Sequence, residues 1–230
     1  MSPSSRTGRS AGSARSKRKP PGYALFEHDR GLGVRYVAGA DEAGRGCLAG
    51  PLVAAAVLLD LDRIRDEDIL ALADLNDSKR QTSASRAALY PLITRVAAKV
   101  AVVSRCAPGI DARGLHVTNL SALREALIAV ARPGCICLSD GFPVASVGHE
   151  QRAVIKGDAT SAALAAASVI AKETRDRYMR RVDERIPGWG FAQHVGYASP
   201  EHRSAIERFG VTPLHRLSFQ SMAYQQLSLG

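Results

Sequence analysis

The chain has 230 residues, which is long enough for one medium-sized domain with a sizeable core. Apolar residues make up 46% of it, which excludes disorder throughout, and no apolar run reaches the roughly 18 residues of a membrane span. The net charge of +9 favours polyanionic partners such as nucleic acid.

The positive charge is concentrated in the first 22 residues. This segment is rich in Ser, Gly and Pro, and it contains six Lys or Arg residues but no acid. It has too few large apolar groups to offset the entropy of ordering, so residues 1–22 are predicted to be a disordered basic tail. A flexible tail that adds nucleic-acid affinity is the favoured interpretation, and the composition is also compatible with an organelle transit peptide.

From residue 31 onward the pattern becomes that of a globular domain. Apolar runs rich in Val, Ala and Leu indicate strands, and Gly or Asn-Asp clusters indicate turns. In chain order we expect a strand at 33–40, a glycine-rich turn at 43–46, a buried strand at 51–59, a loop and helix within 60–73, a turn at 76–79, a helix at 84–94 and a strand at 96–105.

The second half of the chain alternates strands and helices. Leu120, Leu123, Leu127 and Val130 recur at helical spacing, which predicts a helix at 115–130. Short strands at 135–138 and 152–155 and helices at 161–185 and 200–209 are expected after it. This order predicts an α/β domain with a mixed central sheet flanked by helices, plus a small helical C-terminal part.

The four cysteines are Cys47, Cys106, Cys135 and Cys137, and none forms a C-x-x-C pair. Cys135 and Cys137 have apolar neighbours, so buried, reduced thiols are expected and a structural zinc site is not. Reduced thiols favour a cytoplasmic protein.

Four acids follow short apolar runs: Asp41 and Glu42, Asp140, and Asp158. We expect each to lie at the C-terminal end of a strand, where ligands collect in open α/β sheets. Neighbouring strands lie about 4.8 Å apart, so their terminal carboxylates could converge. Unpaired carboxylates repel each other at that distance, and Mg²⁺ or Mn²⁺ relieves the repulsion. Two such ions are a common arrangement for phosphodiester hydrolysis.

Each acid also has a simpler interpretation. Asp140 precedes Gly141, as in many turns, and Asp158 precedes Ala-Thr-Ser, where it could cap a helix. The adjacent pair Asp41–Glu42 beside a Gly-Arg-Gly turn is harder to explain structurally. The coincidence of all three positions favours a metal site and metal-dependent cleavage of nucleic acid.

Several segments carry a resemblance to a known family. They are, in chain order, AGADEAGRGCLAGPLV (38–53), NDSK (76–79), LSDG (138–141), KGD (156–158), AASVIAK (166–172), RD (175–176), HVGY (194–197) and PLHRLSF (213–219). Together they closely resemble the motifs of bacterial ribonuclease HII, the type 2 ribonuclease H, over about residues 34–220.

The resemblance implies a ribonuclease H-like fold, with a catalytic domain at 23–190 and a helical substrate-binding extension at 191–230. It implies an endoribonuclease that cleaves the RNA strand of RNA–DNA hybrids and incises 5′ of single ribonucleotides embedded in duplex DNA. The implied cofactors are two Mn²⁺ or Mg²⁺ ions, the implied products carry a 5′-phosphate and a 3′-hydroxyl, and a monomer is expected.

The resemblance also implies roles for individual residues. The catalytic, metal-binding carboxylates are Asp41, Glu42, Asp140 and Asp158. The ribose-reading turn is Gly44, Arg45 and Gly46, where glycines allow close approach to the 2′-hydroxyl that distinguishes RNA from DNA.

The remaining implied residues contact other parts of the substrate. Tyr197 stacks on the deoxyribose beyond the junction, and Lys79 contacts a backbone phosphate. Ser78 and Asn119 are expected near Lys79. His215 and Arg216 are expected to have structural or phosphate-contact roles. The chain reads Gly-Tyr-Ala-Ser around Tyr197, where many relatives have Gly-Tyr-Gly-Thr.

Two other functions are weighed against this one. A type 1 or type 3 ribonuclease H would share the carboxylates, but the Gly-Arg-Gly turn after Asp41–Glu42 favours type 2. A non-catalytic nucleic-acid-binding protein would depend on basic surface alone, and it predicts no incision with added metal.

Overall fold

A five-stranded mixed sheet forms the centre of the structure, a computed structural model that describes residues 20–76 and 81–219. The strand order is β3-β2-β1-β4-β5. β1 pairs with β4 and β4 with β5 in parallel, whereas β1–β2 and β2–β3 are antiparallel. The strands are β1 (Tyr36–Ala43), β2 (Leu52–Asp60), β3 (Lys99–Arg105), β4 (Cys135–Asp140) and β5 (Glu150–Val154). The expected mixed sheet is therefore confirmed, with β1 at its centre.

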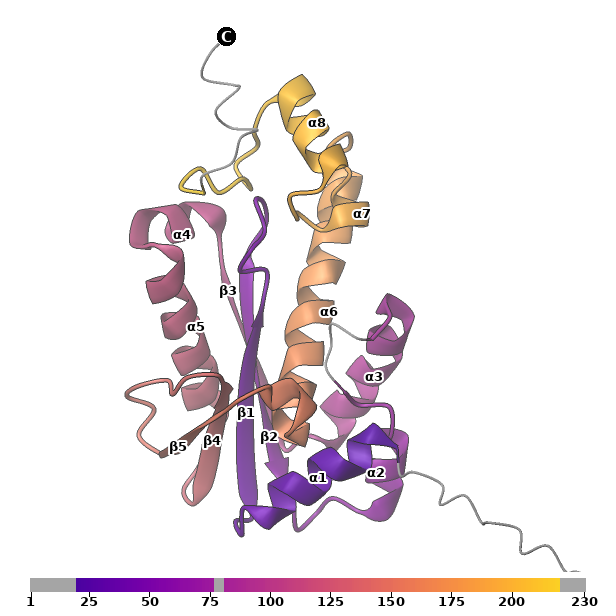
Figure 1. Cartoon of the computed structure of the whole chain (residues 1–230), viewed down its shortest axis with the longest axis vertical. Helices are drawn as coiled ribbons and strands as arrows, with labels where there is room; N and C mark the ends of the chain where they lie inside the picture. Colours follow the sequence, from indigo (N-terminus) through magenta and orange to yellow (C-terminus); the bar gives the residue numbers. More distant parts are fainter. Residues whose placement is uncertain (1–19, 77–80, 220–230) are drawn as a thin grey trace, which may run out of the picture.

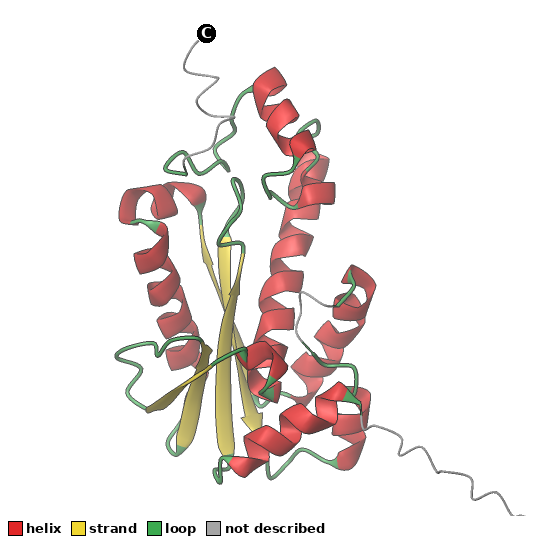
Figure 2. Cartoon of the chain, in the orientation of Figure 1, coloured by secondary structure: helices red, strands yellow, loops and turns green. Residues whose placement is uncertain are grey.

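Helices cover both faces of this sheet (Figures 1 and 2). One face packs against α5, and the other packs against α6 together with α1, α2 and α3. The short helix α7 packs against the C-terminal end of α6, and α8 lies beyond that end. The helices are α1 (Pro21–Gly31), α2 (Asp66–Ala71), α3 (Ser83–Val96), α4 (Ala107–Arg113), α5 (Leu115–Val130), the 3₁₀ turn η1 (Gly157–Ala159), α6 (Ala162–Arg185), α7 (Phe191–His194) and α8 (Pro200–Phe209). Across the described ranges, no helix combines the length and apolar character needed to cross a membrane.

The small residues of α6 allow this helix to press against the central strand. A β-carbon placed on Gly39 of β1 would lie 2.3 Å from the carbonyl carbon of Ala163. Only glycine therefore fits at this point of β1, and the run of alanines that begins α6 is explained by the same close contact. The contact fixes the long helix against the strand that carries Asp41 and Glu42.

Several elements differ from the expectation. α1 begins at Pro21, inside the segment predicted to be disordered, and it buries Leu25 and Phe26. The expected start of the globular domain at residue 31 was thus too late, and α4 and α7 were not predicted. Residues 1–19, which contain the basic part of the tail, lie outside the described residues.

The cysteines are free thiols, and Cys135 and Cys137 are buried as expected; Cys47 is buried as well. Cys106 is exposed at the start of α4. Sγ of Cys135 and Sγ of Cys137 lie 3.8 Å apart on one face of β4. Burial raises the pKa of the Cys137 thiol to about 12, which keeps it protonated and unreactive.

Candidate active site

Asp41 and Glu42 lie within the last residues of β1, and the strand alternation sends them to opposite faces of the sheet. Val37 of the same strand packs in the core cluster on the α6 face, and Ala40 packs on the α5 face. With a period of two residues, Asp41 shares the α6 face and Glu42 the α5 face. The neighbours agree, because Asp41 interacts with Ser168 of α6 and Glu42 with Asn119 of α5. The expected strand end at residue 40 was wrong, since β1 continues to Ala43.

Asp41 holds its proton more tightly than an ordinary aspartate. Burial, together with the negative charges of Glu42 and Asp140, raises its pKa to about 6. Its Oδ1 accepts a hydrogen bond of 2.8 Å from the backbone N–H of Glu42, which opposes that shift. Burial also raises the pKa of Glu42, and Arg45 counteracts it. The acids therefore affect one another electrostatically across a short distance.

Asp140 ends β4, the parallel neighbour of β1. Ala40 pairs with Ser139 in that register, so the next position sets Asp140 beside Asp41. Side chains alternate along a strand, so Asp140 points to the same face as Ile136 and Leu138, which pack against α6. Asp41 and Asp140 therefore share that face.

Asp158 does not end a strand, contrary to expectation. β5 stops at Val154, and the chain passes through Lys156 with a left-handed φ of 54° before the turn η1. The backbone N–H of Gly157 donates to Oδ1 of Asp140 at 2.9 Å, and the buried Asp158 is the residue that follows Gly157 in the chain. Ser161, not Asp158, caps α6, so the helix-cap interpretation of Asp158 is not supported.

The turn after β1 combines a tightly packed glycine with an open one. Gly44 has a φ of 90°, and a β-carbon there would lie 2.1 Å from Nε of Arg175. A β-carbon at Gly46 would meet no atom within 4 Å. Between them, Arg45 is half exposed, and its Nη1 lies 3.2 Å from Oε1 of Glu42. This turn therefore presents a guanidinium and an uncovered backbone next to the carboxylates.

Two fully buried arginines hold the turn from behind. Arg175 of α6 donates to the carbonyl oxygens of Ala49, Pro51 and Val195 at distances of 2.9, 2.9 and 2.7 Å. Arg216 donates through Nη1 to the carbonyl oxygen of Arg45 at 3.0 Å and through Nε and Nη2 to that of Gly50. Charged donors to backbone carbonyls make strong hydrogen bonds. Arg216 is 0% exposed, so of its two expected roles the structure supports the structural one.

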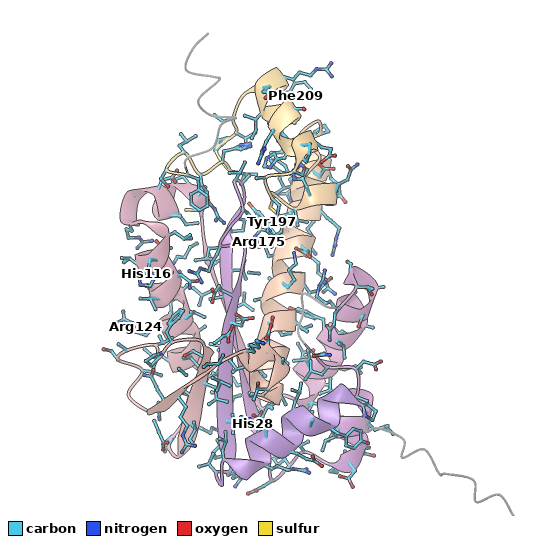
Figure 3. The ribbon with its side chains drawn as sticks, viewed as in Figure 1. His28, His116, Arg124, Arg175, Tyr197 and Phe209 are labelled. Carbon is cyan, nitrogen blue, oxygen red and sulfur yellow. The ribbon has the colours of Figure 1, made fainter. Side chains whose placement is uncertain are left out.

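Tyr197 lies against the same turn, although it comes from the segment between α7 and α8. Burial and the thiol of Cys47 raise the pKa of its phenol, and the Cys47 side chain is its hydrogen-bonding partner. The residue is 45% exposed, and Nζ of Lys172 lies 5.4 Å from the ring centroid. In Figure 3, Tyr197 and Arg175 lie near each other between β1 and α6. Tyr197 thus offers a half-exposed aromatic face beside the Gly-Arg-Gly turn.

Comparison with known proteins identifies the family. The family model described as Ribonuclease HII matches residues 38–222. A protein from Salinispora tropica named Ribonuclease HII is 48% identical over 201 residues, which cover 87% of this chain and 73% of that protein. The chain belongs to the ribonuclease HII family.

Solved structures support the fold. The ribonuclease H2 from Pyrococcus horikoshii OT3 has a TM-score of 0.68 at 25% identity, covering 84% of this chain and 97% of that one. A structure of Bst-RNase HIII in complex with Mn²⁺ has a TM-score of 0.66 at 20% identity, covering 98% of this chain and 76% of the other. The ribonuclease H-like fold expected from the sequence is therefore confirmed, and the protein is a type 2 ribonuclease H, a nuclease.

The residues of this ribonuclease HII site fit a hard divalent cation. Within residues 20–76 and 81–219, no three His, Cys, Asp or Glu side chains form a ready-made metal cage. The donor set is nevertheless all carboxylate, which suits Mg²⁺ or Mn²⁺. Burial is the largest cause of the raised pKa of Asp41, and the negative charges of Glu42 and Asp140 add to it. A cation bound between these carboxylates would offset both effects.

Asn119 is a residue whose role the sequence indicates only weakly. Its side chain is 0% exposed, and neither of its polar atoms forms a regular hydrogen bond within the described part of the chain. It lies close enough to Glu42 to lower the pKa of that carboxyl. A buried amide without a regular hydrogen bond is costly, and the Glu42 carboxylate is a polar group that would stabilise it.

Two further residues were expected near the substrate phosphate. Lys79 and Ser78 fall in residues 77–80, which lie outside the described residues. The structure thus brings the turn Gly44–Gly46, Tyr197, Asp41, Glu42 and Asp140 to one end of the sheet, with Asp158 next to Gly157.

Proposed function

We propose that this ribonuclease H cleaves the RNA strand of RNA–DNA hybrids and incises duplex DNA on the 5′ side of a single embedded ribonucleotide. The observation that carries the proposal is the ion pair of Arg45 and Glu42, with 3.2 Å between Nη1 and Oε1. This ion pair directly connects the turn that would read the ribose with Glu42, one of the carboxylates that would carry out the reaction. Recognition of one 2′-hydroxyl and cleavage beside it would then occur within one small site.

The four acids Asp41, Glu42, Asp140 and Asp158 would hold two divalent ions, Mn²⁺ or Mg²⁺. Such ions supply a water nucleophile at neutral pH and charge stabilisation of the leaving 3′-oxygen, which gives a 5′-phosphate and a 3′-hydroxyl. The Mn²⁺ complex of Bst-RNase HIII, a protein of the same fold, supports this choice of ion.

The protein's own groups would align the ribonucleotide for this reaction. Gly46 leaves its backbone uncovered, so a sugar can approach the peptide groups of the turn closely. Arg45 would turn from Glu42 toward the ribose or its phosphate, because a guanidinium is a suitable donor to both. Gly44 has a different task, since it leaves room for the Arg175 side chain that supports the turn.

Tyr197 would lie on the deoxyribose that follows the ribonucleotide, and close contact there would reject a second 2′-hydroxyl. Lys79 would contact a phosphate near the cut. We therefore propose that residues 191–230 act as a substrate-binding extension of a catalytic domain at 23–190. The contact of Tyr197 with Cys47 supports this division, because Cys47 directly follows the Gly-Arg-Gly turn.

The direct test uses the purified full-length protein with a duplex that carries one ribonucleotide, with Mn²⁺ or Mg²⁺ added. We expect one incision 5′ of the ribonucleotide, with a 3′-hydroxyl on one product and a 5′-phosphate on the other, as mapped by sequencing gels and end-labelling. The Asp41→Asn variant is the control and should bind the duplex without cutting it. Cleavage only where several consecutive ribonucleotides occur would contradict the proposal and indicate type 1 specificity.

A further inference from the structure

Three histidines pack together beneath the backbone of Tyr197. The rings of His194 and His202 are stacked, with centroids 4.2 Å apart and planes 16° apart. Nε2 of His202 lies 3.2 Å from Nε2 of His215, and the edge of Phe191 closes the group. His202 is 0% exposed and His215 is 3% exposed, so water does not solvate the pair. The cluster links α7, α8 and the segment that follows α8.

Hydrogen bonds to the backbone fix the proton on each ring of the His215–His202 pair. The N–H of Thr212 donates to Nδ1 of His215 at 2.8 Å, so this nitrogen must be an acceptor. A neutral His215 then carries its proton on Nε2 and donates it to Nε2 of His202. His202 in turn has its proton on Nδ1 and donates to the carbonyl oxygen of Tyr197 at 2.8 Å. The bonds form one directed chain from Thr212 to Tyr197.

Both rings are neutral in this arrangement. Burial lowers the pKa of His202 and of His215 to about 4. Protonation of either ring would place two N–H groups opposite each other between the rings, and the hydrogen bond between His202 and His215 would be lost. At neutral pH the directed arrangement is therefore the stable one.

The backbone just before Tyr197, which these hydrogen bonds support, is strained. Val195 has a φ of 43°, which a β-branched residue rarely adopts, and Gly196 has a φ of 85°. A β-carbon on Gly196 would lie 2.2 Å from the carbonyl oxygen of Ala49. Strained residues persist only where several contacts hold them, and they gather at functional sites.

His194 supplies further support for the same segment. Its Nδ1 accepts from the N–H of Gly196 at 3.1 Å, and its Nε2 donates to the carbonyl oxygen of Trp189 at 2.7 Å. Its own polar atoms are thus satisfied by the backbone on both sides, and its ring packs on His202.

We propose that His202, oriented by His215, is a positioning residue that sets the height of the Tyr197 ring over the substrate sugar. The inference rests on the proposed role of Tyr197 at the ribonucleotide–deoxyribonucleotide junction. A purely structural core could use apolar side chains at these positions, which avoid the cost of burying polar atoms. This series of hydrogen bonds instead ends on the carbonyl oxygen of Tyr197, the residue whose ring would face the substrate.

Two substitutions at His202 separate positioning from packing. His202→Asn places an amide N–H at the former Nδ1 position and keeps the bond to Tyr197, whereas His202→Gln places its amide at the Nε2 position and loses that bond. The measured quantity is the ratio of kcat/KM on an RNA–DNA junction duplex to kcat/KM on a uniform RNA–DNA hybrid. Thermal unfolding of both variants reports on packing.

We expect His202→Gln to lower the junction ratio about threefold to tenfold, the range that follows from losing one hydrogen bond. His202→Asn should retain most of the wild-type ratio although its melting temperature falls similarly. Equal ratios for the two variants would overturn the inference. If the Gln variant does not fold, His215→Asn replaces it, because it keeps the bond from Thr212 and loses the donor to His202. An unchanged ratio in that variant would overturn the inference equally.

The Tyr197→Ala variant distinguishes failure of the inference from failure of the proposed function. A reduced ratio in Tyr197→Ala with normal ratios in the histidine variants would leave the role of Tyr197 intact and refute positioning by His202. An unchanged ratio in Tyr197→Ala would refute the proposed role of the tyrosine itself.

Discussion

The guanidinium of Arg175 occupies the space that a side chain at Gly44 would need, with 2.1 Å between its Nε and a β-carbon built on the glycine. Arg175 comes from the middle of α6, and Gly44 follows directly after β1. The same guanidinium binds the carbonyl oxygens of Ala49 and Val195. One buried side chain thus ties the Gly-Arg-Gly turn to the segment that carries Tyr197.

The first prediction concerns Gly44→Ala. The substitution meets both the Arg175 side chain and a backbone φ of 90°, so the turn or α6 must shift. We expect a loss of stability of about 1–3 kcal/mol, together with weaker cleavage, measured by urea unfolding and by single-turnover kinetics. Wild-type stability would show that Arg175 has room to move.

Gly46→Ala is the matched comparison, because a β-carbon there meets no atom of the described protein. We expect its free energy of unfolding to stay within about 0.5 kcal/mol of wild type. Cleavage beside a single ribonucleotide should nevertheless fall at least about tenfold, because the methyl group separates the sugar from the backbone. A wild-type cleavage rate in Gly46→Ala would show that the substrate does not need the space beside Gly46.

The third prediction is that Asp41→Asn stabilises the protein while abolishing cleavage. Asp41 has a pKa of about 6 in the folded protein, against 3.8 ordinarily. The stability that its protonated form gives the folded protein is therefore fully present below about pH 4 and is lost as the pH rises through 6. At pH 7 without divalent ions, removing the charge should increase the free energy of unfolding by as much as about 3 kcal/mol. Denaturant unfolding in the presence of a chelator measures this directly.

Added Mn²⁺ supplies the control for that measurement. An ion held by the four carboxylates would bind the folded protein in preference to the unfolded chain, so it should raise the melting temperature of the wild type. The Asn variant should respond much less. Equal responses in both proteins would mean that Asp41 does not hold the ion.

Asn119 gives the fourth prediction, through replacement by Leu, which has a similar size. Its amide is buried and forms no regular hydrogen bond within the described residues, so an apolar side chain should cost little stability or even increase it. Cleavage should fall by about tenfold or more if the amide serves Glu42 or the substrate. Full activity in a stable Leu variant would assign Asn119 to the core.

Local signals in the sequence were sufficient for some elements. The helix α8 was predicted with its observed bounds, and local residues set these bounds in the structure: Ser199 caps the helix, Pro200 starts it and Gly210 ends it. The helix α5 was equally clear from its apolar spacing. The adjacency of β1 and β4 also agreed with the expected meeting of strand ends.

Long-range contacts determined the features that the sequence did not reveal. The helix α1 depends on partners far along the chain: Gly22 donates to the carbonyl oxygen of Ala73, and Asp29 accepts from the N–H of Ala163. The turn that carries Asp158 depends on the bond from Gly157 to Asp140. The support of the Gly-Arg-Gly turn by Arg175 was likewise hidden, because sequence spacing gives no sign that a basic residue is buried.

The last prediction concerns stability at acidic pH. The pKa values of His202 and His215 are lowered to about 4 from 6.5, so the stability that comes from their neutral rings is present above about pH 6.5 and is lost as the pH falls toward 4. For either histidine alone this amounts to roughly 3 kcal/mol. Asp41 acts in the opposite direction over an overlapping range, because its protonated form is the favoured one in the folded protein.

Urea unfolding between pH 7 and pH 4 separates these two effects. The free energy of unfolding of His202→Asn should fall less between pH 7 and pH 4 than that of wild type. That of Asp41→Asn should fall more, because this variant lacks the carboxyl whose protonation stabilises the fold. His116→Asn, at an exposed histidine of α5, serves as the control and should leave the decline unchanged. If His202→Asn declines as steeply as wild type, the buried histidines are not the groups that destabilise the fold in acid. The hydrogen-bond chain beneath Tyr197 would then tolerate a proton, contrary to the arrangement of its donors and acceptors.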